Sequence, residues 1–143
     1  MRILNGILAA VAAALDRLHP DIPVYVDFVP QRLPERCFLL GFAGSPEVKH
    51  DLGRRYLVTG QLDIAYYSPR REAGLAEDLN SIFDSLSAEL QSIAGANFRL
   101  RLPSHRREVV DGVLHDIAPF EVYLLKTDAT PLMRRIAARG GLK

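Results

Sequence analysis

Apolar residues recur at helical spacing in two long segments of the chain. The first segment, Ile3 to Leu18, predicts an N-terminal helix that ends before Pro20, because the residue preceding a proline is pushed out of the α region. The second predicts the main helix from Leu75 to Ile93, with Gly95 closing its C-terminal end. We expect both apolar stripes to face one core. The main-helix stripe consists of Leu75, Leu79, Ile82, Phe83, Leu86 and Leu90.

Other segments have the two-residue alternation of strands. The clearest runs from Arg54 to Tyr67, with one buried and one mixed face, and at this length we expect a bend or bulge at Gly60. Val24 to Phe28 is bounded by prolines and predicts an edge strand. Cys37 to Ala43 is apolar enough for a central strand covered on both faces. Glu47 to Gly53 is polar and predicts a connection, either a short helical turn or a disordered tip.

The segment from Phe98 to Lys126 predicts a hairpin. Asp111-Gly112 stands between β-branched residues, and both central positions of a type I′ turn require positive φ. This turn pairs Val110 with Val113, Val109 with Leu114, Glu108 with His115, and Arg107 with Asp116. Beyond Pro103 and Pro119 the same register would mix a polar with an apolar face, so we expect a bulge or bend there.

The hairpin is expected to have two parts. The base lies in the core and contributes Phe98, Leu100, Leu102, Phe120, Val122 and Leu124. The tip, His105 to Ile117, is rich in charge and is expected to project as an arm, although it could also fold back onto its own sheet. The full predicted core set is Leu62, Ile64, Phe83, Leu86, Val122 and Leu124.

The C-terminal segment predicts a short helix, with Thr130 as N-cap, Pro131 at its first position and Gly140 past its end. Together the elements predict an α+β fold. We expect a largely antiparallel or mixed sheet of about five strands, an N-terminal helix, a main helix between strands and a short C-terminal helix. We expect one domain over residues 1–143.

Composition and charge narrow the function classes. The chain has 143 residues, of which 48% are hydrophobic, enough for a core without disulfides or metals. A net charge of +1 gives no global attraction to nucleic acid or to an anionic membrane. No apolar run has transmembrane length. Cys37 is the single cysteine, and we expect it to be a small buried apolar residue.

Few residues suggest chemistry. His105, His115 and Glu108 could share a metal or act as an acid and base, but no HExxH motif or third nearby histidine accompanies them. We therefore expect them to be solvent-exposed hairpin side chains, and we expect no catalytic, cofactor or metal site. Two alternatives remain: a small enzyme using Glu108, His115 or Asp63, and a nucleic-acid-binding module using arginine pairs. The pairs are Arg54-Arg55, Arg70-Arg71, Arg106-Arg107 and Arg134-Arg135.

Several pieces, in this order, resemble the phage tail terminator family of long-tailed phages and related contractile particles. They are the apolar N-terminal helix, VPQ…CFLL within 29–40, GQLDIAYY at 60–67 followed by Ser68-Pro69, the acidic amphipathic helix, and REVVDGVLH at 107–115. The resemblance covers about Ile7 to Lys126.

The resemblance implies a structural virion protein rather than an enzyme. Members of the family form a ring, usually hexameric, that caps the head-proximal end of the tail tube. The ring stops polymerisation and offers an attachment surface for neck or head-completion proteins. The implied partners are other copies of the chain, tail tube protein, neck proteins and, in contractile tails, the sheath. No membrane and no sequence-specific nucleic acid are implied, although DNA can pass through the lumen. The implied location is the phage tail of the virion, assembled in the host cytoplasm.

A ring needs two complementary surfaces on each subunit. We expect the hairpin tip to form the subunit interface, through Arg106, Arg107, Glu108, Val109, Val110, Val113, Leu114 and His115. If the tip is not an arm, the interface is expected at the strand Val24 to Phe28 or at the C-terminal helix. We expect a second surface, which meets the tube or neck, at Glu47, Lys49, His50, Asp51, Arg54 and Arg55.

Overall fold

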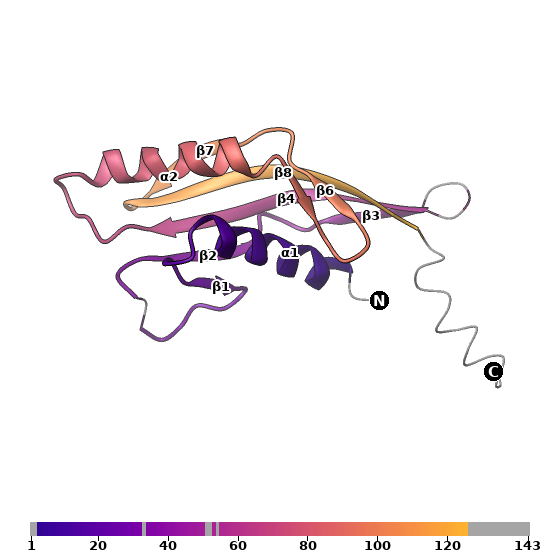
Figure 1. The fold of residues 1–143 in the computed structure, drawn as a ribbon, viewed down its shortest axis with the longest axis horizontal. Coiled ribbons are helices and arrows are strands. Elements are labelled where there is room, and N and C mark those ends of the chain that lie inside the picture. The colour runs from indigo at the N-terminus through magenta and orange to yellow at the C-terminus, as the bar shows by residue number, and fades with distance from the viewer. Residues whose placement is uncertain (1–2, 33, 51–52, 54, 126–143) are drawn as a thin grey trace.

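A computed structural model describes residues 3–32, 34–50, 53 and 55–125 of the chain. Within these residues there are two helices, each followed by four strands (Figure 1). The predicted C-terminal helix, with Thr130, Pro131 and Gly140, lies outside the described residues. The elements are α1 (Ile3–Leu18), β1 (Val24–Val26), β2 (Cys37–Phe42), β3 (Glu47–His50), β4 (Arg55–Tyr67), α2 (Leu75–Glu89), β5 (Ser92–Ala94), β6 (Arg99–Arg101), β7 (Arg106–Val110) and β8 (Val113–Leu125).

The two longest strands, β4 and β8, form the spine of the sheet. They pair antiparallel in one unbroken register from Arg55 opposite Leu125 to Tyr66 opposite Leu114. At the end of the spine near Tyr66 the strand order is β1-β2-β4-β8-β7, and at the other end it is β3-β4-β8-β6-β5. Among the described strands, only the pair β1 and β2 is parallel. The predicted α+β fold is therefore confirmed, with eight strands instead of about five.

The predicted central and edge positions of the N-terminal strands are confirmed. β2 pairs with β1 on one side and β4 on the other, and β1 lies at the edge of the sheet. Cys37, Phe38 and Leu40 of β2 are buried, whereas Leu39 is only half-buried, so the strand is not fully covered on both faces. Burial raises the pKa of the Cys37 thiol, as expected of an unreactive core residue.

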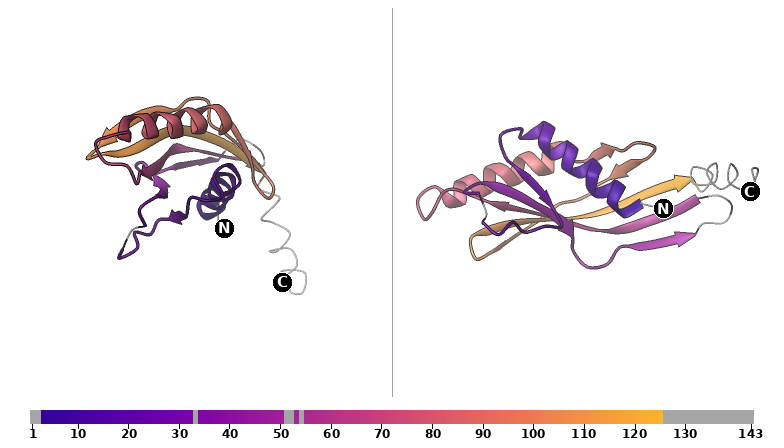
Figure 2. Two further views of the ribbon diagram at one scale, coloured as in Figure 1. Left: turned by 60° about the vertical axis from the view of Figure 1, so that its left-hand side comes forward. Right: turned by 90° about the horizontal axis from the view of Figure 1, so that it is seen from below.

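Both helices contribute to one hydrophobic cluster with the even-numbered positions of the spine. The sheet is curled, so that α1 contacts both β1 and β5, its two terminal strands, and the left view of Figure 2 shows the sheet curving over α1. Most of the predicted core is confirmed. Leu62, Ile64, Leu86, Val122 and Leu124 are buried, but Phe83 is only partly buried at the edge of the cluster.

Three expectations about local structure are wrong. The segment Glu47–His50 is the strand β3, because it pairs with the first half of β4. The main helix ends at Glu89 rather than Ile93, and Gly95 lies beyond it in the turn between β5 and β6. Gly60 is not a bulge: the register with β8 is continuous through it, and the strand beside β4 changes there from β2 to β3.

The predicted hairpin register is confirmed in full. Val110 pairs with Val113, and Asp111 and Gly112 have φ values of 52° and 76°, as a type I′ turn requires. The expected irregularity near the prolines is also confirmed, because β6 pairs Arg101 with Glu121, one residue out of the register of β7.

The tip of the hairpin does not project as a free arm. β8 pairs with β4 as far as Leu114, so its half of the tip lies inside the sheet, and Leu114 and Ile117 are buried. Only β7 lies at the margin, since among the described residues it pairs with β8 alone. The residues most accessible to a partner are therefore those of β7 and the turn.

Candidate functional site

β7 carries most of the predicted interface residues that are accessible. All five of its residues are exposed, including Val109 at 42% and Val110 at 53%. Arg106 donates to Glu108 within the strand, with Nη2 2.8 Å from Oε2. Of the predicted residues on β8, Val113 is half-buried, Leu114 is buried, and His115 is half-buried beside Asp63, with 2.9 Å between Nδ1 and Oδ1.

His105 is not a solvent-exposed hairpin residue, contrary to the sequence-based expectation. Its side chain is only 5% exposed and that of Asp116 is fully buried. His105 Nδ1 lies 2.8 Å from Asp116 Oδ2, and Nε2 lies 2.8 Å from the Leu90 carbonyl oxygen. Both partners are acceptors, so both ring nitrogens donate and the imidazole is protonated. The burial of His105 could not be predicted from the sequence, because several of its neighbours along the chain are charged.

Electrostatics agree with a protonated His105. Burial lowers its pKa, but the hydrogen bond to Asp116, the charge of Asp116 and the hydrogen bond to Leu90 together raise the pKa above its ordinary value of 6.5. The other carboxylate oxygen of Asp116, Oδ1, is buried without a hydrogen-bond partner in the described structure. The sequence did hold a signal for this residue, since Asp116 falls on the same alternation as Leu114, Ala118 and Phe120.

The pair fixes the C-terminal end of α2, and a second polar cluster fixes its N-terminal end. Asp78 on the helix accepts from the Tyr66 hydroxyl at 2.8 Å and from Ser68 at 2.5 Å. Arg36 in turn donates from Nε to the Tyr66 oxygen at 2.8 Å. Tyr66 is fully buried, and burial raises the pKa of its phenol. α2 is thus held over β8 from both ends.

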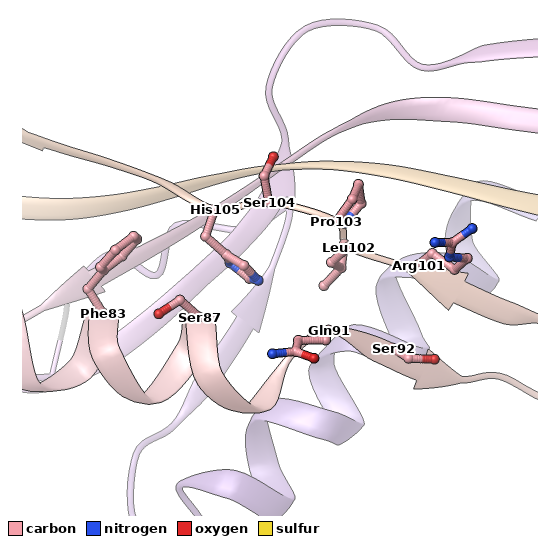
Figure 3. Close-up of a pocket in the computed structure, with 9 residues that line it drawn as sticks. All are labelled: Phe83, Ser87, Gln91, Ser92, Arg101, Leu102, Pro103, Ser104 and His105. Atoms are coloured by element: carbon pink, nitrogen blue, oxygen red, sulfur yellow. The ribbon is translucent and has the colours of Figure 1, made fainter.

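A hollow of about 630 Å³ lies between the end of α2 and the linker from β6 to β7 (Figure 3). His105 points from the linker toward α2, with Ser87 and Gln91 on the helix side. Both nitrogens of His105 are already bonded, and Ser87 donates to the Asp84 carbonyl. In the described structure, both His105 nitrogens are thus directed to acceptors within the protein. Its lining residues are Phe83, Ser87, Gln91, Ser92, Arg101, Leu102, Pro103, Ser104 and His105.

The opposite edge of the sheet exposes an apolar loop. Phe28 and Val29 follow β1 and are 61% and 67% exposed. They border a second hollow, of about 340 Å³, whose wall includes Asp27, Asp63 and His115. Asp27 adopts a left-handed conformation with φ 50°, which fixes the exit of the chain from β1. The signal in the sequence was an apolar pair immediately before Pro30.

The predicted tube or neck surface lies at the far end of the spine. Glu47, Lys49 and His50 are exposed on β3, and Arg55 is exposed at the start of β4, with its guanidinium 4.7 Å from the centre of the Tyr123 ring. Tyr123 is itself 51% exposed. The remaining two predicted residues, Asp51 and Arg54, lie outside the described residues.

The part of the chain that the structure describes contains no group of three or more His, Cys, Asp or Glu side chains able to hold a metal ion. Within the same residues, no helix has the length and apolar character needed to cross a membrane. Of the side chains suggested for an enzyme, Glu108 is bonded to Arg106, and His115 is bonded to Asp63. The described arginine pairs lie on separate elements: Arg106-Arg107 on β7, Arg55 on β4, and Arg70-Arg71 before α2.

Comparison with known proteins gives one informative match. A family model described as "Phage tail terminator protein" matches residues 6–131. No curated protein sequence matches the chain. One matching solved structure has 10% sequence identity, and the alignment covers 86% of this chain and 92% of the other with a TM-score of 0.41, a likeness too weak to support an argument.

Proposed function

The chain belongs to the phage tail terminator family, and from this premise we propose that it forms a closed ring, of six copies, on the head-proximal end of a tail tube. The ring stops polymerisation of the tube and offers an attachment surface to neck or head-completion proteins. The single observation that carries the proposal is the family match, which spans most of the chain. In a contractile particle the ring also meets the sheath.

The subunit interface is proposed on the hairpin. The strand β7 and the following turn supply apolar and charged groups. All five residues of β7 are exposed, which supports this role. Leu114 is buried and supports the hairpin from within rather than touching a neighbour. The proposed interface comprises Arg106, Arg107, Glu108, Val109, Val110, Val113 and His115.

The tube or neck contact is proposed at the far end of the spine. Glu47, Lys49, His50 and Arg55 are exposed there, and the same end carries the exposed Tyr123. Aromatic residues and arginine are enriched in protein interfaces. The ring is proposed to be part of the tail of the virion and to assemble in the host cytoplasm.

The proposal is tested with purified chain and polymerising tail tube protein. Tubes grown with the chain are expected to be shorter, and electron microscopy is expected to show a ring at one end. A Lys49→Glu variant should form the ring but bind the tube end or the neck protein less well, whereas wild-type protein binds both. A chain that stays monomeric and never occupies tube ends would contradict the proposed function.

A further inference from the structure

We propose that in this ring β7 of one subunit lies antiparallel beside β1 of the next subunit, with Arg107 of one copy near Asp27 of its neighbour. The inference rests on the proposed function and adds the receiving surface, which the family match does not specify. The binding partner of each of these two strands is thus a second copy of the chain.

The first observation is that both strands have an open edge. Among the described residues β7 pairs only with β8, and β1 pairs only with β2. They form the opposite margins of the sheet at its hairpin end, as Figure 1 shows with β7 above and β1 below. Edge strands present unpaired amide and carbonyl groups, which readily pair with a strand from another chain.

The second observation is strand direction. β1 is parallel to β2, and each further step from β2 to β4, β8 and β7 reverses the direction. Three reversals leave β7 antiparallel to β1. When copies are arranged head to tail around a ring, the β7 edge of one meets the β1 edge of the next in antiparallel orientation, and the sheet can continue between subunits. Such a heterologous contact is the kind that closes into a ring.

The third observation is where apolar side chains reach the surface. Of seven exposed large hydrophobic residues in the described structure, five lie on these two margins. Val109 and Val110 are on β7, whereas Val26, Phe28 and Val29 are on or directly after β1. Contiguous exposed apolar groups mark interaction surfaces. Here the apolar side chains of one margin can be buried against those of the other margin.

The fourth observation is the charge on each margin. Arg107 and Asp27 are both exposed, and neither side chain has an ion pair or hydrogen bond within the described part of the chain. Their neighbours differ, because Arg106 is paired with Glu108 and Asp63 with His115. One margin therefore carries an unpaired cation and the other an unpaired anion, so the two are complementary in charge.

The test uses two charge reversals. Arg107→Glu places a second carboxylate against Asp27, and Asp27→Arg places a second guanidinium against Arg107, so each variant alone meets like charges at every contact. In an equal mixture, alternating copies restore opposite charges at every contact. At low ionic strength, where such charges are least screened, native mass spectrometry is expected to show loss of the ring for each variant alone. The mixture is expected to recover it, with equal numbers of both variants.

Asp84→Arg, an exposed reversal on α2, is the matched control and should leave the ring intact, while circular dichroism checks that all variants fold. If wild-type protein forms rings but the single reversals do so equally well, or the mixture fails to recover them, this arrangement is wrong and the proposed function stands. If wild-type protein forms no rings, either alone or on tube ends, the proposed function itself fails.

Discussion

His105 and Asp116 form a buried ion pair that joins the hairpin to the end of α2. Their side chains are 5% and 0% exposed, and His105 also donates to the Leu90 carbonyl. Because the pKa of His105 is raised in the folded chain, protonation stabilises the fold. This contribution is complete below about pH 6.5 and is lost as pH rises through the higher folded-state pKa.

The pair therefore predicts a pH-dependent stability. In urea unfolding, the free energy of unfolding of wild-type protein should fall as the pH rises above about 6.5. His105→Gln should be less stable at about pH 6 and should show a flatter profile, because it has no proton to lose in this range. A His105→Gln profile as steep as that of wild type would contradict the assignment.

Removing the anion tests the same pair from the other side. Asp116→Asn removes the charge that keeps the proton on His105, and the buried imidazole is then neutral at about pH 7. The expected loss is therefore that of one charge-assisted hydrogen bond, about 1.5–3 kcal/mol. Chemical denaturation at neutral pH measures this loss. Glu121→Gln on the same strand is the control, because Glu121 pairs with Arg101 in a largely exposed setting and its loss should cost less than about 1 kcal/mol.

The Tyr66 hydroxyl should be important for anchoring α2. Tyr66→Phe removes the bond to Asp78 and leaves Arg36 without its acceptor, which should lower the free energy of unfolding by about 1–3 kcal/mol. Tyr67→Phe is the matched control on the opposite face of β4, and a change within about 0.5 kcal/mol is expected there. Equal effects of the two variants would show that the cluster contributes little.

The sequence predicted the local and strongly patterned elements. The Asp-Gly turn and the alternation of β4 led to the correct hairpin register and the correct buried face. The helix α1 also follows directly from its apolar spacing. In each case, the information lies within a few neighbouring residues.

What the sequence did not predict depends on partners far along the chain. Nothing within Glu47–His50 indicates a strand, because its pairing is supplied by β4. Ile93 continues the helical spacing of α2, yet it becomes part of β5 by pairing with Leu100. The burial of His105 likewise depends on Asp116 and on the end of α2. The hairpin tip was wrongly expected to project for the same reason. Its position depends on β4, which is long enough to pair with β8 as far as Leu114.

The core prediction can be refined at α2. Leu86 is fully buried, and Leu86→Ala should cost about 2–5 kcal/mol. Phe83 is half-buried beside the hollow of Figure 3, so Phe83→Ala should cost less than about 3 kcal/mol, the lower end of the range for fully buried phenylalanine. Thermal or urea unfolding of both variants gives the order, and a larger loss for Phe83→Ala would contradict this packing.

The last prediction separates the surface of the hairpin from its support. Val110 is 53% exposed beside the turn, so Val110→Asp places a charge in water and should leave the folded chain intact while preventing ring formation. Leu114 is fully buried on the facing strand, so Leu114→Asp places an unpaired charge in the core and should unfold the protein. Circular dichroism measures folding, and native mass spectrometry measures assembly. Unfolding of Val110→Asp would mean that Val110 is a core residue. Normal rings from Val110→Asp would instead exclude the β7 margin from the interface, because a buried apolar contact does not tolerate an unpaired carboxylate.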